Sequence, residues 1–234
     1  MGSNAGPKIP QYEKLVFHID AYNTRSHPGS GNTWYDISQA GISGTVVGTA
    51  SFASGGATAS VVFNASTYYN FGSPTSLDIT PSITMNCIWL NRGWNKSWQT
   101  LISKGDHSFR ISRSSAVASN GWYATGQDPN VYWNSGIATS HEYDAWKMVT
   151  ASFNPTTTTV KFYINGIGVS LDTTATRNAS LATTTAPFWV GANFEQSNRQ
   201  LNGNVAVVQL FNGVLSDFEV QDLYASYKGR YGLT

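Results

Sequence analysis

The sequence predicts an all-β fold, a two-sheet antiparallel jelly-roll sandwich with one short C-terminal helix. Three observations support this prediction. Short runs rich in Val, Ile, Thr and aromatic residues recur along the chain, with Gly, Asn and Ser between them. Asn165-Gly166 lies between two such runs, and this dipeptide is a strong signal for a β-hairpin. Only one segment, near the C-terminus, has apolar residues at the spacing of an amphipathic helix.

The predicted strands follow from β-branched and aromatic composition, and the turns between them follow from residues that adopt positive φ. The clearest strand-like runs are 15–21, 45–47, 59–63, 83–90, 100–103, 107–112, 146–153, 159–164, 188–190 and 203–211. Residues 1–14 are rich in Gly, Pro and polar residues and are predicted to form an N-terminal arm. Residues 15–234 are predicted to form one domain, because no linker or shift in composition divides them.

The C-terminal helix is predicted from its first turn. Ser216 and Glu219 have the spacing of a capping box, in which each side chain bonds the other residue's backbone N–H. Apolar side chains then recur at helical spacing, in Val220, Leu223, Tyr224 and Tyr227. Gly229 follows them and is expected to end the helix. Such a helix would lie on the outside of the sandwich.

Composition and charge exclude several classes of protein. Hydrophobic residues make up 41% of the chain, aromatic residues 13% and charged residues 12%, which excludes a disordered chain. The net charge of +1 and the scattered basic residues give no surface for nucleic acid or an anionic membrane. No apolar run approaches the ~18 residues of a membrane span. The first residues lack the apolar region of a signal peptide, so we expect none.

Candidate nucleophiles and metal ligands are few. Cys87 is the one cysteine, so neither an intrachain disulfide nor a multi-thiolate metal site is possible within this chain. It lies in an apolar run, where we expect it to be a buried small hydrophobic residue. The four histidines have no metal-ligand spacing and are expected to have structural or surface roles; they are His18, His27, His107 and His141.

Several motifs occur in an order that is similar to a known family. They are residues 15–36, Gly44-Thr45, 61–64, 146–149, 162–166, 202–205, 215–220 and 227–232. Together they resemble the laminin-G-like (concanavalin A-like) jelly-roll domain. More narrowly, they resemble the version found in structural proteins of tailed phages and marine viruses. The resemblance extends over residues 15–232 and is carried by the order of the motifs more than by any single one.

The resemblance implies two face-to-face antiparallel sheets and a binding or structural role, often with a sugar or calcium at one edge or on the concave face. Two departures remove carboxylates that many relatives carry. This chain has Asn64-Ala65 in place of Asp-Gly, and Asn86 in place of Glu on the next central strand. We therefore expect no cofactor and no family-type metal site. Calcium stays open as an alternative, with the scattered carboxylates Asp20, Asp36, Asp106 and Asp128 as candidate ligands.

The same fold also hosts β-glucanases, so an enzyme must be considered. Retaining hydrolysis uses two carboxylates, which on this fold come from a strand of the form E-x-D-x-x-E. The nearest match begins at Glu142 and Asp144, but Lys147 stands where the second Glu should be. No G-x-S-x-G motif indicates a serine nucleophile either. We expect that the protein is not an enzyme.

Tryptophan provides the candidate binding site, because five of the eight Trp residues lie between positions 89 and 133. Sugar rings stack their C–H faces on aromatic side chains, while Asn, Asp and Gln bond the hydroxyls. The candidate residues are Trp94, Trp98, Trp122, Tyr123, Asp128 and Trp133. A glycan site, an interface between subunits and a role in the core all remain open for these residues.

The first functional hypothesis is a non-enzymatic virion structural protein at the virion surface, decorating a head or tail. Its expected partners are other virion proteins or copies of itself, and host-surface glycans; nucleic acid and membrane insertion are not expected. One alternative is a free lectin-like carbohydrate-binding module. Another is a degenerate glycoside hydrolase, which would depend on Glu142.

Overall fold

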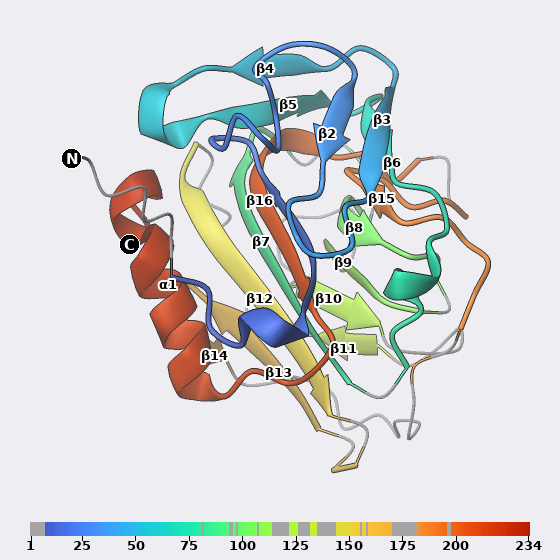
Figure 1. The fold of residues 1–234 in the computed structure, drawn as a ribbon, viewed down its shortest axis with the longest axis vertical. Helices are drawn as coiled ribbons and strands as arrows, with labels where there is room; N and C mark the ends of the chain where they lie inside the picture. The colour runs from blue at the N-terminus through green and yellow to red at the C-terminus, as the bar shows by residue number, and fades with distance from the viewer. Residues whose placement is uncertain are drawn as a thin grey trace.

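The computed structural model describes residues 8–80, 82–93, 96, 98–106, 108–113, 122–125, 132–134, 144–154, 156–157, 159–169, 181, 183–195 and 198–234. Within them, two antiparallel sheets pack face to face, and one helix lies outside the sandwich (Figure 1). The predicted all-β sandwich with a C-terminal helix is confirmed. Three short 3-10 helices complete the described elements, η1 (Tyr12–Lys14), η2 (Gly56–Thr58) and η3 (Thr75–Leu77).

Sheet A lies next to the helix. Its strand order is β14 (Ile167–Val169), β13 (Thr159–Ile164), β12 (Trp146–Asn154), β7 (Ile83–Asn91), β16 (Asn202–Phe211), β5 (Ser60–Asn64) and β4 (Ser51–Ala53), and β1 (Leu15–Asp20) also pairs with β16. Sheet B has the order β11 (Tyr132–Asn134), β10 (Trp122–Thr125), β9 (Arg110–Arg113), β8 (Thr100–Ser103), β15 (Trp189–Val190), β6 (Tyr68–Asn70), β3 (Ser43–Val47) and β2 (Thr33–Tyr35). The sequence therefore predicted the longer strands, and β14 as the second strand of a hairpin, but not β2, β4, β6, β10 or β11.

The predicted hairpin between β13 and β14 is confirmed. Ile164 pairs with Ile167, and the two residues between them have positive φ, 50° at Asn165 and 76° at Gly166. Two positive φ angles in a row are the requirement of a type I′ turn, whose twist matches that of the strands. Asn and Gly adopt this conformation at the lowest cost, so the local sequence determines the turn.

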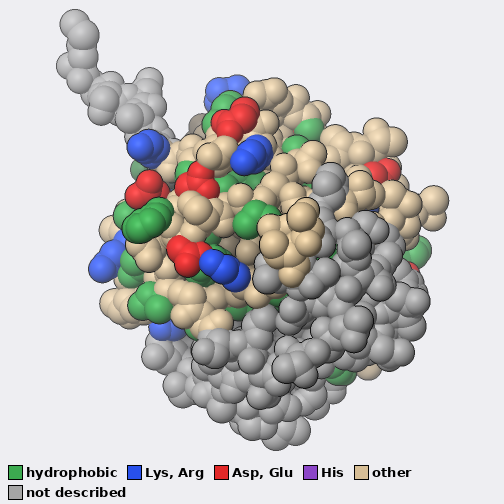
Figure 2. Space-filling view, turned by 90° about the horizontal axis from the view of Figure 1, so that it is seen from below, with side chains coloured by type: hydrophobic (Ala, Val, Ile, Leu, Met, Phe, Trp, Pro, Cys, Tyr) green, Lys and Arg blue, Asp and Glu red, His purple; other side chains and the backbone are tan. Residues whose placement is uncertain are grey.

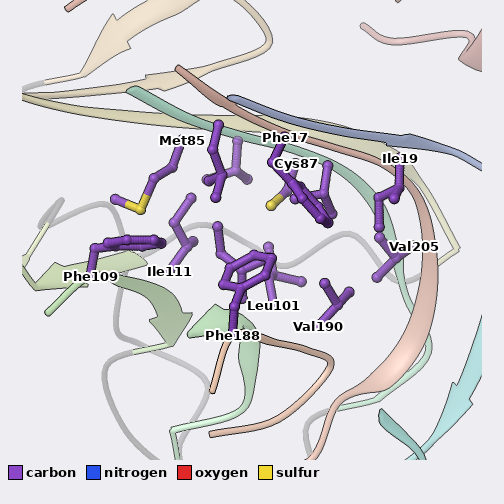
Figure 3. Close-up of a cluster of buried hydrophobic side chains, with 14 of the residues drawn as sticks. Phe17, Ile19, Met85, Cys87, Leu101, Phe109, Ile111, Phe188, Val190 and Val205 are labelled. Atoms are coloured by element: carbon purple, nitrogen blue, oxygen red, sulfur yellow. The ribbon is translucent and has the colours of Figure 1, made fainter. Parts of the chain in front are cut away.

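The main core lies between the two sheets. Phe17 and Ile19 of β1 and Cys87 of β7 point into it from sheet A, and Ile111 and Val190 come from sheet B (Figure 3). Cys87 is fully buried, and burial raises the pKa of its thiol. Its expected role as a buried small hydrophobic residue is confirmed, because its thiol is neither accessible nor ionised.

Helix α1 (Asp217–Tyr231) covers the outer face of sheet A with a second apolar cluster. The capping box is confirmed: Ser216 Oγ accepts from the Glu219 backbone N–H, and Glu219 Oε2 accepts from the Ser216 backbone N–H at 2.7 Å. The expected end of the helix at Gly229 is wrong. The helix continues to Tyr231, and its C-cap is Gly232, which has a left-handed φ of 58°.

The added residues at the end of α1 explain why the helix is longer than predicted. Tyr231 is buried in the apolar cluster beneath the helix. The guanidinium of Arg230 reaches back to sheet A and donates to Asp20 Oδ2 at 2.8 Å. Glycine in a helix interior costs only about 1 kcal/mol, so burial and this ion pair together outweigh the presence of Gly229.

A buried chain of polar side chains joins sheet A to α1. Asn86 Oδ1 accepts from Thr150 Oγ1 at 2.7 Å, and Asn86 Nδ2 donates to Gln209 Oε1 at 3.0 Å. Gln209 Nε2 donates to the hydroxyl of Tyr227 at 3.2 Å, and that hydroxyl lies 3.4 Å from His18 Nε2. Because these partners have fixed geometry, the network sets the position of the helix over the sheet.

The residues that precede β1 run beside α1. The Lys8 carbonyl accepts from Ser226 Oγ at 2.9 Å, and the Gln11 side chain donates to Glu219. Lys14 O accepts from the Asn212 backbone N–H at 2.8 Å. Residues 1–7 lie outside the described part of the chain, and the role of residues 1–14 as a docking arm stays a prediction.

Acidic, basic and apolar side chains are intermingled on the described part of the face that Figure 2 shows. The side chains of Lys161 on β13 and Asp217 on α1 are exposed and form an ion pair, with 2.6 Å between Nζ and Oδ1. In the part of the chain that the structure describes, no helix combines the length and apolarity needed to cross a membrane.

Candidate functional site

Three aromatic side chains gather on the outer face of sheet B, the face turned away from the core. Tyr68 and Trp189 each alternate with a core residue, Tyr69 on β6 and Val190 on β15, so the strand period places them outward. Their rings stack with centroids 4.1 Å apart, and Phe194 meets Trp189 edge-on at 5.3 Å. We call Tyr68, Trp189 and Phe194 the aromatic cluster. Phe194 is 49% exposed, so the cluster can be reached by a ligand.

The turn after β15 brings the aromatic cluster close to charged groups. Gly191 begins this turn with φ of 89°, and a Cβ there would lie 2.4 Å from the ring of Phe63. Only glycine fits this position. The turn then places Phe194 against Trp189 and Glu195 beside Asp106, whose backbone N–H donates to the Glu195 carboxylate.

An ion-pair cluster centred on Asp106 adjoins the aromatic cluster. Asp106 Oδ1 accepts from Arg199 Nη1 at 3.0 Å and from Asn193 Nδ2 at 2.6 Å, and it also pairs with Arg110. Both guanidinium groups lie over the ring of Trp98, with 5.6 Å to the ring centroid for Arg199 and 5.9 Å for Arg110. The cluster therefore combines fixed hydrogen-bonding groups with a fourth aromatic ring.

The register of sheet B connects the two clusters. Trp189 pairs with Ser103 on β8, and Ser103 pairs with Arg110 on β9, so all three lie on the same face. Two strand spacings separate Trp189 from Arg110, about 10 Å. The Trp189 indole N–H and the Ser112 hydroxyl have no hydrogen-bond partner among the described residues. The aromatic cluster and the ion-pair cluster thus lie within the length of a short saccharide.

Of the six residues predicted for the site, the structure describes the side chain of one and the backbone of three others. Trp98 lies in the ion-pair cluster, on the outer side of sheet B. Trp122 and Tyr123 belong to β10 and Trp133 to β11, with Tyr123 in register with Ser112; their side chains are outside the description. Trp94 and Asp128 lie outside the described residues, as do His107 and His141.

The sequence analysis missed the aromatic cluster and the two arginines. Tyr68, Trp189 and Phe194 are far apart in the sequence, and only the pairing of β6 with β15 joins the first two. One local signal was present. Trp189 is the central residue of Phe188-Trp189-Val190, and strand alternation turns a central Trp outward when both of its neighbours enter the core.

Three of the four candidate calcium ligands are described, and each is occupied by protein donors. Asp20 is paired with Arg230, and Asp36 Oδ1 accepts from the backbone N–H groups of His18 and Ser38, both at 2.8 Å. Asp106 is held in the ion-pair cluster. Among the described residues, no group of three or more His, Cys, Asp and Glu side chains could hold a metal ion.

The two positions that depart from the family pattern have structural roles. Asn64 Oδ1 accepts from the Ser66 hydroxyl at 2.8 Å and the Thr67 hydroxyl at 2.9 Å, which holds the turn where Ala65 has a φ of 63°. Asn86 lies in the buried network beneath α1. A carboxylate at position 86 would be buried beneath the helix, on the side of sheet A away from the core.

The segment considered for hydrolysis begins outside the described residues, at Glu142. Asp144 is described and pairs with Arg92, with 3.1 Å between Oδ1 and Nη1. Lys147 Nζ donates to Thr234 O at 3.4 Å, near the end of α1. The two described charged residues of this segment therefore have contacts elsewhere in the protein, Asp144 with Arg92 and Lys147 with the Thr234 carbonyl.

The family model described as the concanavalin A-like lectin/glucanases superfamily matches residues 63–221. Among curated proteins, none matches the chain by sequence. Several solved structures match at identities low enough that the likeness shows the fold alone.

Three of these structures illustrate the range. Domain 4 of AbnA, an extracellular GH43 arabinanase from Geobacillus stearothermophilus solved with arabinotriose, is 17% identical, with a TM-score of 0.66 over 90% of this chain and 98% of that one. The binding domain of Paraclostridial Mosquitocidal Protein 1 is 14% identical, with 0.68 over 92% and 53%. Trypanosoma rangeli sialidase with sialic acid is 13% identical, with 0.66 over 98% and 35%. The chain thus spans about half of the second structure and a third of the third.

Proposed function

The chain belongs to the concanavalin A-like lectin/glucanases superfamily, and from this membership and its geometry we propose that it binds carbohydrate on the outer face of sheet B. The observation that carries the proposal is the partly exposed aromatic cluster of Tyr68, Trp189 and Phe194 beside the Asp106 ion-pair cluster. The arabinotriose and sialic acid held by two of the similar structures support a carbohydrate ligand.

The chemistry of the two clusters complements a saccharide. The apolar C–H face of a sugar ring can pack on the aromatic cluster, and the burial of that face provides the driving force. Asp106 holds Arg110, Arg199 and Asn193 in fixed positions beside the aromatic cluster. Fixed donors and aromatic surfaces lose little conformational entropy when a ligand binds.

We further propose that the domain binds without hydrolysing its ligand. Among the described residues, the two carboxylates that lie near the aromatic cluster are already engaged: Asp106 by Arg110, Arg199 and Asn193, and Glu195 by the Asp106 backbone N–H. Retaining hydrolysis needs an acid and a nucleophile that both face the glycosidic bond. Incubation with the best-bound oligosaccharide, followed by chromatography, should leave it intact. A cleavage product that disappears in Glu195→Gln would contradict the proposal.

The binding site can be tested with a glycan array followed by calorimetry on the best oligosaccharide. Trp189→Ala should weaken binding by about 1–3 kcal/mol, the range measured for bases stacked on aromatic side chains. The matched control is Phe218→Ala, because Phe218 is an exposed aromatic residue on α1, 80% accessible and remote from sheet B. Equal affinities for the two variants would contradict the location of the site. An array without any bound glycan would contradict the function.

The finer proposal, a location on a virion surface with other virion proteins as partners, is supported by the motif order that resembles phage and marine-virus structural proteins. Separation of source material on a density gradient, with detection of this chain by mass spectrometry, tests it directly. A fixed copy number in the particle fractions is the expected result. A purely soluble distribution would contradict the virion role and leave the carbohydrate-binding function in place.

A further inference from the structure

A pocket lies at one edge of the sandwich, where the loop after β1 meets β4 and η2. Its volume is about 240 Å³. β4 is the edge strand of sheet A and β2 the edge strand of sheet B, and both lie at the same end of the molecule (Figure 1). Tyr22, His27, Pro28 and Phe52 form its apolar and aromatic walls, and Thr24 and Ser54 add hydroxyl groups. We call this the His27 pocket. It shares no residue with the site on sheet B.

The loop that carries His27 is held by internal hydrogen bonds. The Asn23 carbonyl accepts from the backbone N–H groups of Ser26 and His27, at 2.8 Å and 2.9 Å. Ser26 Oγ donates to the Tyr35 carbonyl at 2.6 Å and accepts from the Asp20 backbone N–H at 3.0 Å. The pocket is therefore formed before any ligand arrives, which lowers the entropic cost of binding.

The imidazole of His27 is fixed on both of its sides. Its ring stacks parallel on Phe52, with centroids 4.7 Å apart and an angle of 3°, and it meets Trp34 edge-on at 5.9 Å. His27 Nδ1 accepts from the Gly29 backbone N–H at 3.1 Å. Gly29 has a φ of 85°, a conformation that glycine adopts without strain. The ring cannot turn without losing these contacts.

The remaining ring nitrogen, Nε2, is a hydrogen-bond donor. Because Nδ1 accepts, the neutral ring carries its proton on Nε2. Burial lowers the pKa of His27, so the neutral form is present at neutral pH. His27 is only 3% exposed, and no described residue accepts a hydrogen bond from Nε2. An acceptor bound in the pocket would therefore meet a donor whose position is already fixed by the contacts of the ring.

We propose that the His27 pocket binds a single sugar unit, with Nε2–H of His27 donating to a hydroxyl or ring oxygen. Three features favour this ligand. A volume of about 240 Å³ lies below that of pockets for drug-sized molecules, which suits one ring. Phe52, Tyr22 and Pro28 provide apolar contact for a ring face, and the hydroxyls of Thr24 and Ser54 complement sugar hydroxyls. The protein then has two separate carbohydrate sites, one on the outer face of sheet B and one at the edge formed by β2 and β4.

Two substitutions separate the pocket donor from the loop hydrogen bond. In His27→Asn, the amide oxygen can still accept from the Gly29 N–H as an Asx-turn, but no donor reaches the position of Nε2. In His27→Gln, the longer amide places a donor near that position. Both variants lose the stacking on Phe52 equally, so each is a control for the other.

The experiment records amide spectra of the ¹⁵N-labelled full chain during titration with methyl α-L-arabinofuranoside, methyl β-D-galactopyranoside and methyl β-D-glucopyranoside. We expect at least one glycoside to shift the signals of Gly29 and Ser54. His27→Asn should weaken this binding roughly three- to tenfold, as expected for the loss of one hydrogen bond, and His27→Gln should retain most of it. Trp189→Ala should leave it unchanged.

Three results would overturn the proposal. One is the absence of any shift at Gly29 and Ser54 with all three glycosides. Another is equal binding by His27→Asn and His27→Gln, which would show that Nε2 makes no contact. A third is loss of the shifts in Trp189→Ala, which would assign the sugar to sheet B. Failure on sheet B alone would instead leave the Gly29 shifts intact, so the two proposals can fail separately.

Discussion

Acid should destabilise the protein through His18, a buried residue whose ring lies beside the Tyr227 hydroxyl beneath α1. Burial and then the positive charge of Arg230 lower the pKa of His18 from 6.5 to about 4. The unfolded chain therefore binds a proton at this residue between about pH 6.5 and pH 4, whereas the folded protein does not. Stability is complete above the unfolded pKa and is lost as the pH falls towards the folded one.

The size of the effect follows from the two pKa values. With 6.5 in the unfolded chain and about 4 in the folded protein, linkage gives a loss of roughly 2 kcal/mol between pH 7 and pH 5. Other groups also titrate in or near this pH range. His27 has a lowered pKa and adds to the loss, while Asp217 and Glu219, whose pKa values are also lowered, contribute mainly at lower pH. A comparison with a variant isolates His18.

Urea denaturation of the protein and of His18→Gln, followed by tryptophan fluorescence at pH 7, 6 and 5, measures the difference. Glutamine keeps a polar group near Tyr227 but does not titrate. The wild-type free energy of unfolding should fall by roughly 2 kcal/mol more than that of the variant. Parallel pH profiles would refute the reasoning. An independent NMR titration of the imidazole that gives a pKa near 6.5 would refute it as well.

Three substitutions test other parts of the fold. Gly191→Ala should destabilise the protein by about 2 kcal/mol or more in urea denaturation, since its Cβ would lie 2.4 Å from Phe63; an unchanged midpoint would contradict this. Ser216→Ala should cost about 1 kcal/mol in thermal unfolding, and Ser216→Thr should recover most of it if the bond to Glu219 is responsible. Asn86→Asp should destabilise more at pH 7 than at pH 4, relative to wild type, because an ionised carboxylate is costly to bury; equal losses at both pH values would indicate that solvent reaches the site.

The features that the sequence predicted are those determined by neighbouring residues. The Asn165-Gly166 hairpin and the capping box at Ser216 depend on contacts within four positions, so residue type and spacing are enough. The end of α1 depends on Tyr231 being buried and on Arg230 meeting Asp20, a contact across the whole chain. A rule based on the local glycine therefore placed the end too early.

The candidate site shows the same division. The density of Trp residues drew attention to positions 89–133, but composition does not report which strands are neighbours. The aromatic cluster exists because β6 pairs with β15, which brings Tyr68 to Trp189. Asp106 was a calcium candidate as an isolated carboxylate, and the structure instead places two arginines against it. Long-range pairing, which a single sequence does not show, decides both.

The pairing of β1 with β16 has a consequence for synthesis of the protein. Residues 15–20 pair with residues 207–211. During translation, β1 therefore cannot form its sheet pairing until residues 207–211 have left the ribosome. Until β16 has been synthesised, the side of β7 that pairs with it has no hydrogen-bond partner. The apolar side chains of Phe17 and Ile19 on β1 are then not held in the core. Nascent chains stopped before β16 should therefore recruit chaperones or aggregate, and the sandwich should close only after translation.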